Sequence, residues 1–139
     1  MNVFAALLAR EARYNPDGTF DVLGAGIFAV GVPTLPAAIR LTLVLRAQLD
    51  PDEANRLHHL RLRLLDEGDS DVMPAMTVPV ILRQGTAPRH YLNIVTDVIA
   101  PFPRAGNFRF QVAVDDEAIP FIHLTVTHQP QLEAGESNS

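Results

Sequence analysis

The strongest constraint on the fold is an alternation of apolar and polar side chains in the middle of the chain. Apolar residues occupy the odd positions from Ile39 to Leu49, and leucines occupy the even positions from Leu60 to Leu64. A period of two places successive side chains on opposite faces of an extended strand, whereas a helix repeats its apolar positions every ~3.6 residues. Turn-forming residues fill the connection 50–55, so the two strands are expected to pair as an antiparallel hairpin.

The same period predicts further strands along the chain. Apolar side chains alternate from Phe108 to Val114, residues 115–117 suit a turn, and the chain is expected to return through Ile119–Thr127 as a second hairpin. Four more strands are expected at Val3–Glu11, Phe20–Val32, Met76–Arg83 and His90–Ile99. We therefore predict an all-β fold: a single antiparallel two-sheet β-sandwich of about eight strands, Ig-like in general form.

The alternation also indicates which side chains are buried. The predicted core consists of Leu41, Leu43, Leu45, Leu60, Leu62, Leu64, Phe108, Phe110 and Val112. Gly24 and Gly26 precede a strand-like segment rather than a helix, so they are expected to form a bulge or a close strand contact and not a dinucleotide loop. The β-sandwich domain is expected to span residues 1–130, with the polar residues 131–139 as a disordered tail.

Composition excludes several classes of protein. A chain of 139 residues that is 47% hydrophobic and 19% charged is long and apolar enough to fold as one domain. It contains no cysteine and no lysine, which removes disulfides, thiolate metal sites and lysine-based catalysis. The net charge of −5 argues against a nucleic-acid partner, and no apolar stretch approaches the ~20 residues of a membrane span. The apolar run Val3–Ala9 lacks the basic flank of a signal peptide, so we expect a cytoplasmic protein.

The titratable residues form no familiar catalytic motif. His58 and His59 are neighbours on a strand, so their side chains are expected on opposite faces and cannot chelate one metal ion. The other histidines are scattered, and no serine lies in a nucleophile elbow. We therefore expect a protein that is not an enzyme and uses no cofactor, and an enzyme with a dispersed site ranks last among the alternatives.

The densest acidic cluster lies at residues 66–71. Asp66, Asp69 and Asp71 are the candidate ligands for a hard cation such as calcium, which prefers several carboxylate and carbonyl oxygens in one loop. The competing interpretation is a solvated turn that follows a strand. A small-ligand or calcium-binding sandwich that uses this loop is therefore the alternative function.

The predicted first hairpin also defines a candidate interaction face. Pairing Leu45 with Leu60 would bring a set of outward residues onto one surface: Arg40, Val44, Arg46, His59, Arg61 and Arg63. Arginine is enriched at interface cores because its planar guanidinium can pair and stack as it loses water. The competing interpretation is a solvated face that nearby carboxylates neutralise. Since the chain is acidic, a protein partner is expected, and the mixed outward face favours a homodimer.

Several short motifs occur in a familiar order. Leu23-Gly24-Ala25-Gly26-Ile27 precedes Pro33-Thr34-Leu35-Pro36, then Asp50-Pro51-Asp52-Glu53, and finally Pro103-Arg104-Ala105-Gly106-Asn107-Phe108. This order resembles an uncharacterised family of small bacterial all-β proteins of unknown function. The resemblance implies an Ig-like sandwich and carries over no catalytic residue. The expected function is therefore a non-catalytic binding or assembly module that acts through a sheet face or rim loops, with no nucleic acid and no membrane as partner.

Overall fold

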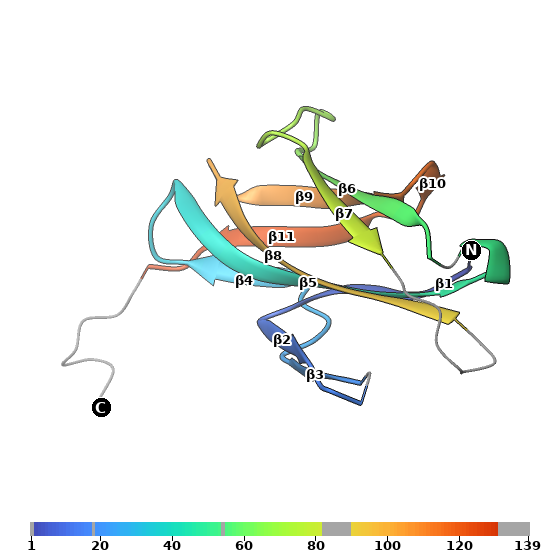
Figure 1. Cartoon of the computed structure of the whole chain (residues 1–139). Coiled ribbons are helices and arrows are strands. Elements are labelled where there is room, and N and C mark those ends of the chain that lie inside the picture. The colour runs from blue at the N-terminus through green and yellow to red at the C-terminus, as the bar shows by residue number, and fades with distance from the viewer. Residues whose placement is uncertain (1, 18, 54, 82–89, 131–139) are drawn as a thin grey trace.

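The computed structural model describes residues 2–17, 19–53, 55–81 and 90–130, and Figure 1 shows the arrangement of their strands. These residues form eleven strands and one short 3₁₀ turn, and they contain no α-helix. The elements are β1 (Asn2–Ala9), β2 (Glu11–Tyr14), β3 (Phe20–Leu23), β4 (Ala29–Val32), β5 (Ala37–Leu49), η1 (Pro51–Glu53), β6 (Leu57–Leu65), β7 (Met76–Ile81), β8 (His90–Phe102), β9 (Gly106–Val114), β10 (Glu117–Ala118) and β11 (Ile122–His128). The predicted all-β class is confirmed.

The strands form three sheets rather than the expected two. One sheet has the order β1-β5-β8, a larger one has the order β4-β11-β9-β6-β7 with β10 beside β9, and β2 pairs only with β3. The pairing is antiparallel except between β4 and β11, which run parallel. A parallel pair needs a long connection, and here most of the chain lies between the two strands.

The predicted first hairpin is wrong in its pairing. β5 pairs with β1 and β8, whereas β6 pairs with β7 and β9, so the two strands belong to different sheets. The connection from Asp50 to Arg56, which includes η1, crosses from one sheet to the other. The leucine faces of β5 and β6 therefore meet across the core instead of lying side by side in one sheet.

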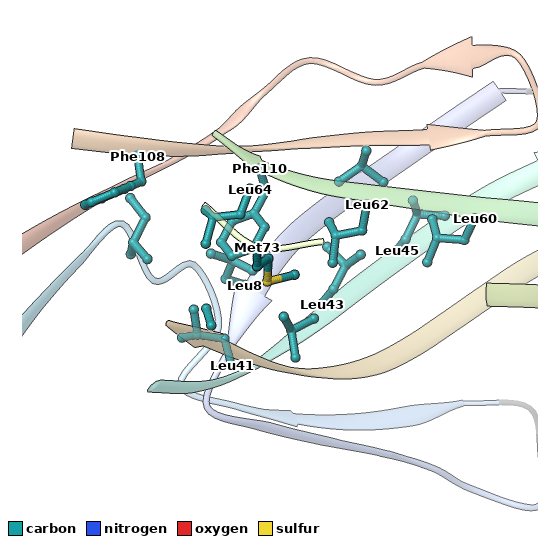
Figure 2. Close-up of a cluster of buried hydrophobic side chains, with 14 of the residues drawn as sticks. Leu8, Leu41, Leu43, Leu45, Leu60, Leu62, Leu64, Met73, Phe108 and Phe110 are labelled. Carbon is teal, nitrogen blue, oxygen red and sulfur yellow. The ribbon is translucent and has the colours of Figure 1, made fainter. Parts of the chain in front are cut away.

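The predicted core is nevertheless buried, as Figure 2 shows for the leucines of β5 and β6. All nine predicted core residues are at most 2% exposed. The same cluster contains Leu8 from β1, Phe102 from β8 and Leu124 from β11, so strands of both larger sheets contribute to it. Phe102 and Phe108 pack edge to face with ring centroids 4.9 Å apart, a favoured geometry for aromatic pairs.

One other predicted strand is divided in the structure, and the second predicted hairpin is present. The expected strand Phe20–Val32 is divided into β3 and β4 by a loop in which Gly24 and Gly26 have φ values of 63° and 81°. This left-handed backbone suits glycine, and the Gly26 N–H donates to the Leu8 carbonyl, so the glycines make the expected close strand contact. The second predicted hairpin is confirmed, since β11 pairs antiparallel with β9. Residues 82–83 of one expected strand and the expected tail 131–139 lie outside the described residues.

The small β2–β3 hairpin lies against the outer side of β5 and β8. The Tyr14 hydroxyl donates to the Asn93 carbonyl of β8, which fastens the hairpin to this sheet. Val44, an outward residue of β5, is only 3% exposed. The β1-β5-β8 sheet therefore has a partly covered outer face.

Candidate functional site

The structure divides the six residues of the candidate interaction face between two sheets. Arg40, Val44 and Arg46 belong to β5, whereas His59, Arg61 and Arg63 belong to β6. Arg46 lies opposite Asn93 and His59 lies opposite Pro79, so the register that would join the two groups does not exist. The six residues do not form one surface.

The two arginines of β5 are engaged locally. The Arg40 guanidinium contacts Asp97 at 2.6 Å, and the Thr42 hydroxyl donates to the same carboxylate at 2.7 Å. The hydrogen bonds from Thr42 and Arg40 lower the pKa of Asp97. The Arg46 guanidinium lies 4.5 Å from the centre of the Tyr91 ring, within cation–π range.

The acidic loop 66–71 is fastened to strands by arginines. Arg63 donates from Nε and Nη2 to the two carboxylate oxygens of Asp71, both at 3.0 Å, which is the bidentate geometry that arginine favours. Arg104 reaches Asp66 at 3.4 Å, and Arg109 contacts Asp69. The pKa of Asp71 is lowered, chiefly by its hydrogen bond with Arg63.

The loop carboxylates also hold the backbone. Asp66 accepts hydrogen bonds from the N–H groups of Ser70 and Gly68, and these bonds lower the pKa of its carboxyl group. Glu67 accepts from the Asn107 N–H of β9 at 3.0 Å. Asp66, Asp69 and Asp71 therefore face different partners, and the described residues contain no cluster of three or more histidine and carboxylate side chains arranged to hold a metal ion. The solvated-turn interpretation did not include the arginines that hold this loop, which are Arg63 of β6, Arg109 of β9 and Arg104 in the turn before β9.

A second polar constellation joins two segments that are distant in sequence. His58 is 3% exposed, with Nδ1 at 2.7 Å from Asp115 Oδ2 and Nε2 at 2.7 Å from the Glu53 carbonyl oxygen. Asp115 also accepts the His59 N–H at 2.9 Å. As predicted, His58 and His59 point to opposite faces of β6, but the partnership with Asp115 carries no local sequence signal. Its role is to tie η1 and β6 to the turn after β9.

The outer face of β6 carries a shallow polar depression of about 510 Å³ beside that turn. His59, Arg61 and Thr77 line it together with Asp115 and Asp116. The lining includes both a guanidinium, from Arg61, and two carboxylates, so the depression does not carry charge of one sign. It contains only two members of the predicted interaction face.

An apolar groove of about 720 Å³ lies between β1 and the start of β11, hereafter the β1–β11 groove. Its walls are residues 2–3 and 5–8 of β1, the loop segment Gly26–Phe28, and the segment Glu117–His123. Phe28 is 76% exposed and Phe121 is 42% exposed, both beside this groove. No local sequence pattern indicates this groove, because its walls come from segments far apart in the sequence and it depends on which strand edges approach each other.

The described part of the chain has no helix long and apolar enough to cross a membrane. The sequence matches none of the curated proteins with which it was compared. A family model described as a family of unknown function, DUF6941, matches residues 5–127, which include all but the margins of the described fold. The resemblance to an uncharacterised family is thereby confirmed, and the chain belongs to the family of unknown function DUF6941.

Proposed function

We propose that the protein is a non-catalytic binding module that holds a protein partner in the β1–β11 groove. The observation that carries this proposal is the exposure of Phe28 and Phe121 at the walls of this apolar groove. Large aromatic side chains are enriched in protein interfaces, where they become the anchors of binding. Exposed apolar groups that surround a groove are also typical of recognition sites.

The polar residues support binding rather than catalysis. The arginines and carboxylates described above form structural pairs: Arg63 with Asp71 fastens a loop to a strand, and Arg40 with Asp97 joins the neighbouring strands β5 and β8. The buried histidine is held at both ring nitrogens, so neither nitrogen faces a pocket. We therefore propose that the protein is not an enzyme and uses no cofactor, and that with a net charge of −5 it does not bind nucleic acid.

The arrangement of the sheets into layers is a second proposal. We infer that the β1-β5-β8 sheet and the strands β6, β9 and β11 are the two layers of an Ig-like sandwich, to which β2–β3 is an addition. The shared core between these strands supports this assignment. A bacterial cytoplasm is the proposed location, since a chain without cysteine needs no oxidising compartment to fold.

A homodimer is a second proposed assembly, and it rests on a different surface. Leu57 of β6 and Ile81 of β7 are cross-strand neighbours, and both are 55% exposed. A twofold dimer would cover this pair with the same pair of a second copy. Sedimentation at micromolar concentration tests the dimer, and a mass near 15.2 kDa under all conditions would remove it.

Co-purification from the native cell, followed by mass spectrometry, tests the binding function. We expect a partner that binds the unmodified protein and the Ile99→Asp variant but not the Phe28→Asp variant. Ile99 is the matched control because it is 70% exposed and does not line the groove. A partner that binds all three proteins equally would place the interaction elsewhere, and turnover in a broad hydrolase screen would contradict the absence of catalysis.

A further inference from the structure

We propose that the β1–β11 groove binds an extended, apolar polypeptide segment of a partner, which adds as a strand to the free edge of β11. This inference rests on the proposed function and specifies the mode of binding. Its basis is the direction of backbone hydrogen-bonding groups in the walls of the groove.

The wall formed by β11 has an unpaired stretch at its start. The Thr125 N–H donates to the Phe28 carbonyl at 2.9 Å, on the edge of β11 where β4 lies. Successive residues of a strand direct their backbone groups to opposite edges, so the N–H and C=O of His123 point to this same edge. Pairing with β4 begins only at Thr125, and β9 lies on the other edge. Among the described strands, none pairs with His123 on the groove side.

The wall formed by β1 is an edge as well. β1 is the terminal strand of its sheet, with β5 on its other side. The Leu8 carbonyl accepts hydrogen bonds from the N–H groups of Gly26 and Ile27, so Leu8 directs its backbone groups away from β5. By the same alternation, Ala6 directs its N–H and C=O into the groove. Each wall therefore presents the N–H and C=O of one residue to the groove, His123 on β11 and Ala6 on β1.

This arrangement selects a polypeptide over other apolar ligands. A strand edge offers backbone N–H and C=O groups, and another extended backbone can form hydrogen bonds with both kinds of group. A small apolar molecule could cover Phe28 and Phe121, but it would take the water away from the backbone groups and leave them without partners. Each such loss is unfavourable, which disfavours that occupant.

The edge at β7 and the uncovered start of β11 differ in a way that supports the proposal. At one end, β7 carries Pro79, which has no N–H to offer an incoming strand. Phe121 and the β11 residues Ile122–Leu124 contain no proline, Pro120 lies just before them in the same wall, and small side chains at Ala5 and Ala6 leave room along the opposite wall. Pro79 thus blocks the β7 edge to an incoming strand, while the β11 edge is open at His123 and is bounded by Pro120.

The residues that line the groove indicate which side chains the bound segment carries. Glu117 is the single carboxylate among the lining residues that the structure describes, and no arginine is among them. His123 is the other titratable side chain there. A complementary segment therefore carries apolar side chains at alternate positions and a basic side chain where it passes Glu117.

The first test uses amide hydrogen exchange in the free protein. We expect the His123 amide to exchange at least ~10-fold faster than the Leu124 amide, which faces β9. Equal protection of both amides would mean that the edge is already paired, and it would overturn the proposal.

The second test uses seven-residue peptides selected from a random display library on the intact protein. Selected peptides should alternate apolar residues, carry Arg or Lys near one end, and slow His123 amide exchange at least ~10-fold at saturation. N-methylation of the peptide amides that face β11 should abolish binding, whereas N-methylation of the alternate amides should not. Binding that survives both modifications would show side-chain docking without strand addition.

A variant separates this inference from the proposed function. His123→Pro removes the N–H that faces the groove and leaves the pairing of Ile122 and Leu124 with β9 in place. We expect His123→Pro to weaken peptide binding at least ~10-fold, equivalent to about 1.4 kcal/mol, and His123→Ala to retain it. A partner lost with Phe28→Asp but kept with a folded His123→Pro would refute strand addition and leave groove binding intact. If His123→Pro does not fold, the exchange and N-methylation results decide alone.

Discussion

The Asp115→Asn substitution is expected to destabilise the protein near pH 6 and to lose this effect, or reverse it, as the pH rises. The buried His58 ring faces the carboxylate of Asp115 through Nδ1 and the carbonyl oxygen of Glu53 through Nε2. A carbonyl oxygen can only accept, so Nε2 carries a proton. An ionised carboxylate also only accepts, so Nδ1 carries a second proton and the ring is an imidazolium.

The pKa shifts follow from this geometry. Burial opposes the charge of His58, but the hydrogen bonds with Asp115 and Glu53 outweigh it and raise the pKa of the ring. Burial likewise opposes the charge of Asp115, and hydrogen bonds from His58 and the His59 N–H outweigh it and lower the pKa of that carboxyl. The pair is therefore fully charged between the unfolded-state pKa values of its members, about 3.9 for Asp and about 6.5 for His.

The sign of the pH dependence can be worked out for each partner. Above pH ~6.5 the unfolded chain loses the His58 proton while the folded chain retains it, so stability falls by up to ~1.4 kcal/mol per pH unit until the folded pKa is passed. Below pH ~3.9 the unfolded chain gains the Asp115 proton first, so stability falls as the pH drops through the folded pKa of Asp115. The contribution of the pair is present between these two limits.

The Asp115→Asn substitution alters only part of this arrangement. The amide oxygen of the new side chain still accepts the His59 N–H, and asparagine tolerates the φ of 54° found at this position. Near pH 6 the variant loses a hydrogen bond between two charged groups, and because the Asp115 side chain is 41% exposed we expect a loss of about 1–2 kcal/mol, below the ~3 kcal/mol upper limit for such bonds. Once His58 is neutral, Nδ1 accepts, and the amide N–H of the introduced asparagine can donate to it where a carboxylate cannot. The variant should then equal or exceed the unmodified protein in stability.

Urea unfolding at pH 6 and pH 9 measures this reversal. Asp116→Asn serves as the control, because Asp116 is an exposed neighbour in the same turn. We expect the control to change stability by less than ~0.5 kcal/mol at both pH values. A loss for Asp115→Asn of the same size at pH 6 and pH 9 would refute the imidazolium assignment.

Three further outcomes test other parts of the fold. Leu43→Ala and Leu62→Ala should each lower the free energy of unfolding by about 2–5 kcal/mol in urea titration, since both leucines are buried. Arg61→Ala should change it by less than ~0.5 kcal/mol because Arg61 is exposed, and equal effects would reject the assigned strand faces. A double-mutant cycle of Arg63→Gln and Asp71→Asn should give a coupling of about 0.2–1 kcal/mol that declines in high salt, because the pair is partly exposed; a coupling that salt leaves unchanged would contradict this. Gly24→Ala should lower the thermal midpoint more than Gly68→Ala, because Gly24 has a φ of 63° and a Cβ there would meet Arg10, whereas a Cβ on Gly68 meets Asp66 Oδ1 at an ordinary 3.5 Å.

The sequence predicts strand faces much better than strand neighbours. The period of two at Leu41–Leu45 and Leu60–Leu64 places every one of these leucines in the core, as the structure shows. The same pattern is satisfied whether two strands lie side by side in one sheet or face each other across a core, because both arrangements bury the same side chains. Adjacency in sequence favoured a hairpin, and the seven-residue connection from Asp50 to Arg56 crosses between sheets instead.

The candidate sites show the same limit. The acidic loop 66–71 was recognisable in the sequence. Its partner Arg109 lies in β9 and its partner Arg104 lies in the turn before β9, so their contacts with the loop depend on tertiary structure. The contact between His58 and Asp115 joins residues 57 positions apart, and the β1–β11 groove is defined by two edges whose approach no local pattern encodes. No local pattern in the sequence predicts the groove that we propose as a binding site, because it depends on the arrangement of strands.

The parallel pair β4–β11 has a consequence for the way the chain folds as it is made. Ala29 lies opposite Thr125 and Val32 lies opposite His128, and β11 is the only described strand that pairs with β4. At ~5–20 residues per second, a ribosome needs about 5–20 s to extend the chain from the first of these strands to the last. Until then β4 has no partner, and such long-range pairing also slows folding of the finished chain to milliseconds or longer. The nascent protein therefore passes through a period in which Val30 and Val32 are exposed, and a chaperone that shields extended apolar segments would act during that period.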